Sequence, residues 1–467
     1  MDIRISKADV IWSYIAQFLQ LASGILVLPY VLHMLPAEEI GLNYLMLTIG
    51  TMVALLDFGF APQFGRNISY IYGGAQHLKK EGVECIDGAD INYHLLASMI
   101  QVAQKVYRIL SVVVFMVMMT AGSAYMYYVT EGFTSVHNSL LIWLVYSLST
   151  YYQIYFTYYN SLLIGCGKIK ESKYAIIASR LTYIVLCIGF IYSGLSLLGL
   201  CLANLIYPFV SRIISYHYYF TKELRIKLSH EKVSIDETKE LFGVIWYNAK
   251  KLGINFLGSY AINKMGMFIA GLYLTLTEIS SYGLMIQLVT LIGSLSSMFF
   301  GTMNPKFAVY RVQNNNNKLI DQFACTQIVF YVLFMMGSSI LILLGPYFLS
   351  IIESHSVLPS NCILLLYCLF VMLEFNHSNF ATIIVTGNDV PFVKAAILAG
   401  IAIIVCSFIS LHLLQMGIMG LVLSQGLCQL AYNNWRWPKY VLDDFGITYL
   451  EFLKKGIVQT IVYLKRR

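Results

Sequence analysis

Apolar stretches of about 20 residues follow one another almost from end to end of this chain. At about 1.5 Å per residue, a helix of that length crosses the hydrocarbon core of a bilayer. Inside that core the backbone must satisfy its own hydrogen bonds, and a helix does so within a single segment. The composition, with 58% hydrophobic and 12% charged residues, is far from that of soluble domains. The sequence therefore predicts an all-α polytopic membrane protein.

The stretches predict about twelve spans in two lobes of six. The spans are placed at 10–35, 41–62, 106–129, 139–165, 172–194, 195–220, 247–274, 281–304, 323–352, 359–386, 390–414 and 417–440. A helical approach, Leu95–Lys105, precedes the third. We expect an N-terminal six-helix lobe over 1–220, a cytoplasmic linker over 221–245, a C-terminal six-helix lobe over 246–440 and a cytoplasmic amphipathic tail over 441–467.

Charge is distributed unevenly between the hinges that join these spans. Every Lys and Arg lies either inside a span or in an odd-numbered hinge, counting the N-terminus as the first. The other hinges hold acids instead, namely Glu38, Glu39, Glu131, Glu278 and Glu353. Because cytoplasmic loops collect cations, this pattern predicts a bacterial inner-membrane protein with both termini in the cytoplasm. The net charge of +7 then reflects loops facing anionic lipid rather than nucleic acid.

Motifs for catalysis, metal binding or processing are missing from the sequence. It contains no P-loop, GxSxG or HExxH, and its nine cysteines include no CxxC pair. We therefore expect no enzyme chemistry, no cofactor and no metal, and transport driven by an ion gradient, the membrane potential or the substrate's own gradient. The first apolar stretch is of full span length without a small-residue cleavage site, which favours a span over a cleaved signal peptide.

The two halves of the chain look related. Ile40–Leu42 opens the second span and Tyr282–Leu284 opens the eighth, each with a central glycine. The second span ends in Pro62–Phe64 and the eighth in Pro305–Phe307, both followed by an arginine. Six spans is an even number, so both halves would insert the same way up, as parallel repeats. Such repeats leave a cavity between them that suits alternating access.

Two capping boxes predict surface helices. Ser234 and Glu237 have the required spacing in the linker, and Thr448 and Glu451 have it in the tail. Leu450, Leu453, Ile457 and Ile461 then recur at helical spacing beside basic residues. This pattern is typical of a helix that lies on the membrane surface.

Charged residues inside predicted spans are costly, so they are candidates for function. Those that lie well inside a span, away from its first turns, are Asp57, Arg180, Arg212, Lys264 and Glu374. Two interpretations compete for Lys264 and Glu374. One is a structural ion pair or a hydrogen bond to backbone inside the bundle. The other is a cationic cavity for an anionic guest such as a diphosphate, with Glu374 as an ionisable switch. Arg212 lies near a span end, where it could instead snorkel to the interface.

Two further clusters lie within spans. The segment Glu374–Asn379 contains Asn376 and His377 as well, which is unusually polar for a span and suggests water access. The fourth span carries tyrosines that share one helical face, at positions 151, 155, 158 and 159. Such a face suits sugar rings, but it equally suits helix packing or the membrane interface.

The first 80 or so residues resemble a known family. The matching residues are Trp12, Gln17, Ser23-Gly24, Leu28-Pro29-Tyr30, Leu35, Glu39-Ile40-Gly41, Leu55 to Pro62, Arg66, Ser69-Tyr70 and Gly73-Gly74-Ala75. This stretch resembles the Wzx-type flippases of O-antigen and related polysaccharide repeat units, which belong to the multidrug/oligosaccharidyl-lipid/polysaccharide (MOP) exporter superfamily. The rest of the chain matches only in span count, in the split after six spans and in the basic hinge.

The resemblance implies a two-lobed helical fold and a substrate, an undecaprenyl-diphosphate-linked oligosaccharide used in lipopolysaccharide assembly. That substrate would move from the cytoplasmic to the periplasmic leaflet by alternating access. By position, Arg180, Arg212 and Lys264 would line a cationic substrate cavity, with Arg66 at its cytoplasmic mouth. Ion coupling would fall to Glu374 and Asp57. Membrane lipid and other polysaccharide-assembly membrane proteins are the partners it suggests.

Alternatives stay open at this point. A different MOP-superfamily exporter of lipids or amphiphiles would have the same span pattern, and a peptidoglycan-precursor flippase typically carries two more spans. A polytopic polysaccharide polymerase or ligase would be an enzyme, and such enzymes usually have a large periplasmic loop with Arg and His. The predicted outer loops here are short and hold no Arg, which disfavours that class.

Overall fold

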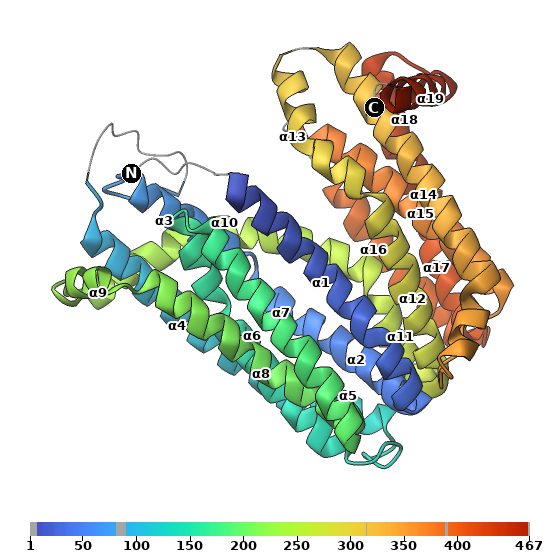
Figure 1. Cartoon of the computed structure of the whole chain (residues 1–467), viewed down its shortest axis with the longest axis horizontal. Helices are drawn as coiled ribbons and strands as arrows, with labels where there is room; N and C mark the ends of the chain where they lie inside the picture. Colours follow the sequence, from blue (N-terminus) through green and yellow to red (C-terminus); the bar gives the residue numbers. More distant parts are fainter. Residues whose placement is uncertain (1–6, 81–89, 314, 388–390, 466–467) are drawn as a thin grey trace. The chain divides into compact units, whose positions relative to one another are not determined.

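The computed structural model describes residues 7–80, 90–313, 315–387 and 391–465. Within those ranges every regular element is a helix and none is a strand (Figure 1). The chain divides into two compact units, unit 1 over 1–257 and unit 2 over 258–467. Each unit is described by itself below. The all-α polytopic fold class is thereby confirmed, whereas the predicted division into lobes, linker and tail stays a prediction.

Unit 1 is built from long helices that pack side by side around α6. Its helices are α1 (Lys7–Met34), α2 (Ala37–Ala54), α3 (Phe60–Tyr72), α4 (Tyr93–Val117), α5 (Ser123–Val129), α6 (Ser139–Gly165), α7 (Ile169–Phe190), α8 (Ser196–Tyr219), α9 (Lys222–Ser229) and α10 (Ile235–Asn263), the last of which ends in unit 2. α6 packs on α3, α4 and α8, and α7 packs on α1 and α8. Trp143, Tyr107 and Phe64 are fully buried in this bundle.

Unit 2 is a second helical bundle with its own aromatic core. Its helices are α11 (Met265–Tyr273), α12 (Leu276–Ser296), α13 (Met298–Val312), α14 (Asn316–Ile351), α15 (Asn361–Val385), α16 (Val393–Phe408), α17 (Gly417–Ala431), α18 (Asn433–Phe445) and α19 (Tyr449–Lys465). Phe307, Phe323, Phe380 and Phe452 meet in one buried cluster near the start of α14. Phe452 belongs to α19, so the predicted amphipathic helix of the tail is anchored to the bundle.

The helices are long and apolar enough to make this a multi-pass membrane protein. Seven helical segments meet the length and composition of a span, taking the described residues alone. One of them, Ile169–Tyr219, holds 51 residues and contains both α7 and α8, which meet at a kink where Gly194 has φ +84°. Large apolar side chains such as Leu343, Val185 and Met116 point outward, as expected of a surface that faces lipid. The count of twelve spans stays a prediction.

Four predicted spans are interrupted among the described residues: the second, the seventh, the eighth and the twelfth, the last at Tyr432 between α17 and α18. The second, 41–62, breaks between α2 and α3 because Phe58 and Gly59 adopt left-handed backbone with φ +46° and +79°, which a right-handed helix cannot contain. The eighth, 281–304, breaks at Ser297 between α12 and α13. Both breaks precede the matched Pro-x-Phe segments, and the phenylalanines, Phe64 and Phe307, are both 0% exposed.

Two other expectations about spans need correction. The helical approach Leu95–Lys105 is not a separate element, because α4 runs without a break from Tyr93 to Val117. The seventh span is interrupted at Lys264, whose φ of −127° separates α10 from α11.

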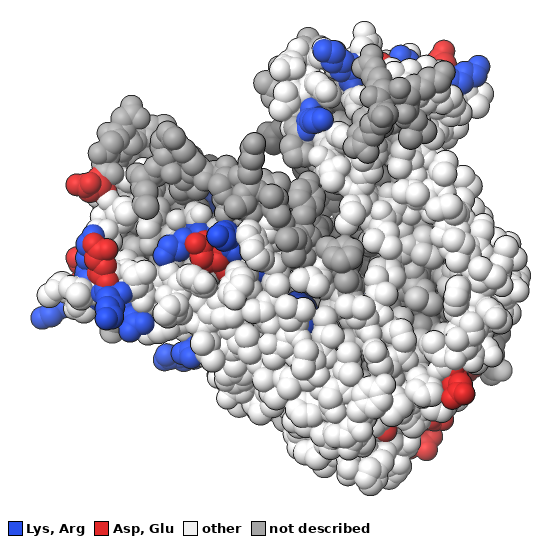
Figure 2. Space-filling view, viewed as in Figure 1, with Lys and Arg blue, Asp and Glu red and all other residues white. Residues whose placement is uncertain are grey.

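Lys and Arg side chains gather at one end of each unit (Figure 2). In unit 1 the basic end carries α9, with exposed Lys222, Arg225 and Lys227. The opposite end carries α5 and the loop with exposed Glu131 (Figure 1). In unit 2 the basic end carries α13, α18 and α19. Away from its basic end, the visible surface of each unit is largely uncharged. The assignment of the basic ends to the cytoplasm stays a prediction.

Candidate functional site

Arg212 is surrounded by aromatic rings in the bundle of unit 1. Its guanidinium carbon lies 5.4 Å from the ring centre of Tyr216, one turn further along α8. Across the helix interface it lies 5.8 Å from the ring centres of both Phe156 and Tyr159 on α6. Rings at these distances attract a cation through their π faces, by about 0.5–2 kcal/mol each. The side chain is therefore held inside the bundle rather than extended into bulk water.

The same guanidinium has a donor with no protein partner. Among the described residues, the buried Nε of Arg212 has no hydrogen-bond acceptor, and none of the ion pairs found there involves its side chain. Leaving such a group unsatisfied costs about 1–3 kcal/mol. An arginine that is stacked but unpaired can offer its charge to an anion that enters from outside.

Arg180 has a similar environment on the neighbouring helix. Its guanidinium carbon lies 5.2 Å from the ring centre of Tyr207, so α7 supplies the cation and α8 supplies the ring. α7 and α8 pack closely along their length. The structure thus brings Arg180 and Arg212 onto adjacent helices of one unit. Of the predicted cavity residues, they are the two that share this aromatic setting.

The tyrosine face predicted on the fourth span contributes to this setting only in part. Tyr158 and Tyr159 are buried, with ring centres 4.3 Å apart. Tyr158 also packs on Tyr107 of α4. Tyr151 and Tyr155 stack on each other at 6.1 Å and are half-buried. Helix packing therefore accounts for Tyr158 and Tyr159, whereas Tyr151 and Tyr155 are partly exposed.

Arg66 and Asp57 lie near the broken second span and are engaged locally. The guanidinium of Arg66 is exposed and donates to the side-chain oxygen of Gln63, one turn earlier on α3. Asp57 accepts a hydrogen bond of 2.6 Å from the buried hydroxyl of Tyr107 and one of 3.4 Å from the backbone N–H of Ala61. Asp57 thus ties the break between α2 and α3 to α4.

Lys264 belongs to unit 2, whereas both stacked arginines belong to unit 1. Its side chain is exposed at the break between α10 and α11. The possible direct pair with Glu374 is not formed, since the described contacts of that carboxylate are with Gln429 and His377.

Glu374 sits at one end of a chain of polar side chains in unit 2. Gln429 of α17 donates to its Oε1 at 3.3 Å, and Asn433 of α18 donates to Gln429 at 2.7 Å. Trp437 donates to Asn433 at 3.0 Å. The Nε2 atom of His377 lies 3.9 Å from the carboxylate. A small cavity of about 10 Å³ between α15 and α17 adjoins Glu374 and Gln429, which is room for about one water molecule.

Asn376 and Asn379, which lie on α15 like Glu374, contact α14. Asn376 accepts a hydrogen bond of 2.9 Å from Gln327 of α14, and Asn379 donates to the same glutamine at 3.1 Å. Asn376, Asn379 and Gln327 are all buried. The polar segment Glu374–Asn379 thus contacts two different helices. Its amide side chains bond α14, and its carboxylate lies beside the cavity next to α17.

Sequence reasoning missed the partners of the predicted residues. Tyr216 follows Arg212 by four positions on one helix, so its contact was foreseeable. Phe156, Tyr207 and Gln429 come from other helices, and no local pattern identifies them. No group of three or more metal-binding side chains occurs in the described part of the chain.

The comparisons with known proteins bear on the fold. No protein-family model and no curated protein sequence matches this chain. Among solved structures it is similar to an inward-facing multidrug resistance MATE family transporter of the MOP superfamily, with TM-score 0.64, 13% identity, and coverage of 91% of this chain and 95% of that one. It is also similar to the lipid II flippase MurJ in an inward closed conformation, with TM-score 0.63, 15% identity and coverage of 98% and 93%.

A third similar structure is a MOP superfamily transporter from Pyrococcus furiosus whose binding pocket is described as reversed in polarity. It has TM-score 0.50, 14% identity and coverage of 95% and 97%. The chain has the fold of the MOP-superfamily transporters. The structural similarity at such low sequence identity establishes the fold alone. Membership of the Wzx-type flippases, the substrate and the coupling ion are proposals.

Proposed function

We propose that this chain is a Wzx-type flippase. It moves an undecaprenyl-diphosphate-linked oligosaccharide from the cytoplasmic to the periplasmic leaflet of the bacterial inner membrane by alternating access, and it is not an enzyme. The observation that carries this proposal is the setting of Arg180 on α7 and Arg212 on the neighbouring α8, which rest on different aromatic rings without a carboxylate partner among the described residues. The MOP fold and the resemblance of the first 80 or so residues support it.

Stacked arginines suit a diphosphate. Taking a phosphate out of water is costly unless fixed cations and hydrogen-bond donors replace the lost hydration. A guanidinium can give two parallel N–H donors to one phosphate, and it keeps its charge at any physiological pH. The rings hold Arg212 in place, so less freedom is lost when an anion binds. The half-open Tyr151 and Tyr155 offer flat apolar faces to the sugars that follow the diphosphate.

The other predicted site residues take secondary roles in this proposal. Lys264 and Arg66, both with exposed side chains, add positive charge to the substrate path, with Arg66 at the cytoplasmic mouth. Glu374 carries ion coupling, supported by its place beside a small cavity and its uncharged amide partner Gln429. Asp57 is the weaker coupling candidate, because its two hydrogen bonds already serve the helix break.

A second candidate function is export of another lipid or amphiphile. It is favoured by the similarity to a MATE family transporter, whose name concerns multidrug resistance. The unpaired cations of unit 1 argue against a cationic drug, which would need acids to bind it. A different class of protein, a polysaccharide polymerase or ligase, is the alternative that would make the chain an enzyme. If the chain is a flippase, other polysaccharide-assembly proteins are its proposed partners.

Leaflet exchange tests the proposal. The purified full-length chain is placed in liposomes with a fluorescent undecaprenyl-diphosphate glycan, and arrival of the sugar on the opposite face is followed. We expect exchange well above that of protein-free liposomes. Exchange of a cationic amphiphile but not of any diphosphate lipid would establish the exporter instead. A change in glycan length during the assay would point to the polymerase or ligase.

A further inference from the structure

A groove lies at the basic end of unit 1, and Gln104 on its wall hydrogen-bonds Tyr158, which stacks on one of the rings around Arg212. One wall is a single face of α4, formed by Gln101, Gln104, Lys105 and Arg108. These residues recur at the spacing of helical neighbours. The other wall is the segment 233–238, which contains the start of α10. The groove has a volume of about 480 Å³, much more than a single water needs.

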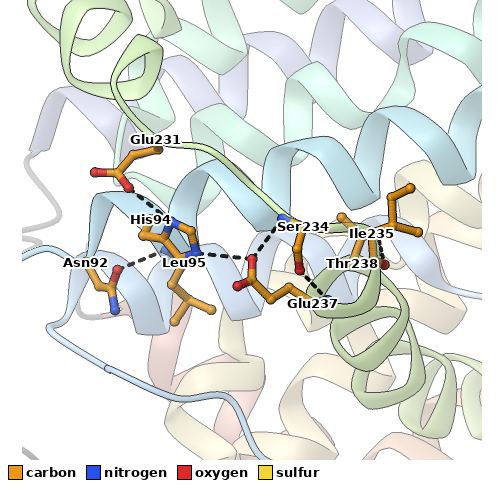
Figure 3. A network of polar contacts seen from close by, with 8 residues as sticks. All are labelled: Asn92, His94, Leu95, Glu231, Ser234, Ile235, Glu237 and Thr238. Carbon is orange, nitrogen blue, oxygen red and sulfur yellow. Dashed lines mark hydrogen bonds and ion pairs between the residues drawn. The ribbon is translucent and has the colours of Figure 1, made fainter.

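The wall opposite α4 is held in place by a histidine clamp (Figure 3). His94, in the first turn of α4, lies between two carboxylates, with Nδ1 3.0 Å from Glu231 and Nε2 3.1 Å from Glu237. Both ring nitrogens face an acceptor, so both must donate, which is the protonated form of the ring. Lys227 of α9 adds a second tie through the hydroxyl of Tyr93 at 3.1 Å. The groove is therefore a built feature and not a gap beside a loose linker.

The clamp also engages the acids nearest the groove, although one imidazolium between two carboxylates leaves a single negative charge over. Glu231 and Glu237 both engage His94, and Glu237 accepts a further hydrogen bond from the backbone N–H of Ser234 at 3.1 Å. Asp236 pairs with Lys239 at 3.3 Å. Lys105 and Arg108, by contrast, have no ion-pair partner in the described part of the chain. The groove is thus lined by two cations without ion-pair partners and by two amide side chains, and it lies beside the one negative charge left on the clamp.

The position of the groove along α4 identifies the kind of ligand. Directly after Arg108, the exposed side chains on the same helix turn apolar, with Ile109 at 56% and Met116 at 60% exposed. An exposed apolar face in a candidate span is in contact with lipid. Lys105 and Arg108 therefore lie where hydrocarbon gives way to water, which is the level of the phosphate groups of a bilayer.

We infer that this groove is an anion site for a phosphate group at the membrane surface. Arg108 and Lys105 supply the charge, and Gln101 and Gln104 supply amide donors. The N-terminus of α10 adds the partial positive charge of a helix start. The ligand chemistry is an anionic phosphate group, either in the headgroup of an anionic phospholipid or as free phosphate or diphosphate. Basic pockets beside spanning helices commonly bind lipid headgroups in this way.

Binding to the full-length chain tests the inference and separates the two sources. The protein in neutral detergent is titrated calorimetrically with short-chain phosphatidylglycerol, with short-chain phosphatidylcholine and with sodium pyrophosphate. Phosphatidylglycerol that binds more tightly than phosphatidylcholine supports a headgroup site. Pyrophosphate binding of equal strength assigns the site to the phosphate alone. No preference for either anion over phosphatidylcholine overturns the proposal.

Variants of matched charge locate the site. The double variant Lys105→Gln/Arg108→Gln should bind phosphatidylglycerol about 30-fold more weakly, since each cation near an anionic headgroup contributes about fivefold. The control Lys79→Gln/Lys222→Gln removes two exposed cations of the same unit that do not line the groove, and it should change binding less than about threefold. If both double variants lost phosphatidylglycerol binding equally, the effect would be one of general surface charge, and the proposal would be overturned.

A third variant guards against misfolding. Lys105→Arg/Arg108→Lys keeps both charges and should retain binding within about threefold. Loss of binding in this variant as well, with its melting temperature unchanged, would contradict a site that rests on two cations in a groove. These readouts do not use transport, so failure of this site and failure of the proposed flippase activity can be told apart.

Discussion

The interiors of the two units use opposite chemistry. In unit 1, Arg180 and Arg212 are stacked on rings and keep their charge free of carboxylates among the described residues. In unit 2, Glu374 is held by the amide of Gln429, with the nearest basic group, His377, 3.9 Å away. Rings stabilise a cation without neutralising it, and amides do the same for an anion. The contrast is what the proposal of anion binding in unit 1 and ion coupling in unit 2 rests on.

The largest effect should come from removing the charge of Arg212. Arg212→Gln should weaken binding of an undecaprenyl-diphosphate lipid by about 10- to 100-fold, because hydrogen bonds to charged groups contribute about 1.5–3 kcal/mol. Arg212→Lys should lose less, since it keeps the charge and loses the planar stacking. Fluorescence binding to the purified protein measures both. Unchanged affinity in Arg212→Gln would make this arginine structural and remove the contrast between the units.

Close helix packing in unit 1 should give the next largest effect. A Cβ at Gly165 of α6 would lie 2.6 Å from Ile68 and 2.8 Å from the carbonyl oxygen of Gly65 on α3. Gly165→Ala should therefore destabilise the protein by about 1–3 kcal/mol, measured as a lower melting temperature in detergent.

Gly189→Ala is the matched control, because nothing lies within 4 Å of its added carbon. The equivalent test in unit 2 is Gly456→Ala, where the carbon would lie 2.6 Å from the carbonyl oxygen of Ala324 and would push α19 off α14. Equal melting temperatures for Gly165→Ala and Gly189→Ala would show that α6 and α3 pack less tightly than described.

Replacing the carboxylate of unit 2 should change coupling rather than binding. Glu374→Gln keeps a side chain that can bond Gln429 and loses the ionisable group. We expect transport to fall by about tenfold and to lose its dependence on pH, with lipid binding nearly unchanged. Asp443→Asn, which changes an exposed carboxylate of the same unit, is the control. Normal transport by Glu374→Gln across the pH range would refute the coupling role.

The smallest effect concerns the capping boxes at the basic ends of both units. The backbone N–H of Ser234 and the ring of His94 hold the pKa of Glu237 below its usual value. The backbone and hydroxyl of Thr448 do the same for the pKa of Glu451. A carboxyl with a lowered folded pKa stabilises its contacts above its unfolded pKa of about 4.3, and this contribution is lost as pH falls through the folded value.

Amide exchange over 231–238 and 448–452, corrected for intrinsic rates, should therefore rise below about pH 4. In Glu237→Gln the first segment should respond little to pH while the second still does. A response of both segments in that variant would mean that global unfolding, and not the local cap, is being measured.

The sequence predicted which segments are helical better than where they break. The fourth span coincides with α6, and both capping boxes form as expected, with Ser234 bonded to Glu237 and Thr448 to Glu451. Hydropathy follows the composition of a stretch, so it did not detect the left-handed backbone at Phe58 or the break at Lys264. The first break comes from two adjacent left-handed residues, Phe58 and Gly59, and the second from Lys264 alone.

The candidate site was predictable in its charged residues and not in their surroundings. Arg180, Arg212 and Glu374 stand out because charge inside an apolar span is costly. What decides their chemistry is supplied by other helices, as when α6 places Phe156 and Tyr159 against Arg212. Such contacts depend on how helices pack, which no local spacing records. The pair of Lys264 and Glu374 was wrong for the same reason, since span depth alone does not bring two side chains together.

Leaflet exchange with one variant from each unit tests most directly whether unit 1 binds the anion and unit 2 couples transport to an ion. Liposomes containing the wild type, the double variant Arg180→Gln/Arg212→Gln or Glu374→Gln are given a fluorescent undecaprenyl-diphosphate glycan, with and without a pH gradient. We expect the wild type to exchange faster under the gradient, the arginine variant to lose exchange in both conditions, and Glu374→Gln to keep slow exchange that ignores the gradient. Full exchange by the arginine variant would contradict the anion-binding role of unit 1, and with it the division of labour between the two units.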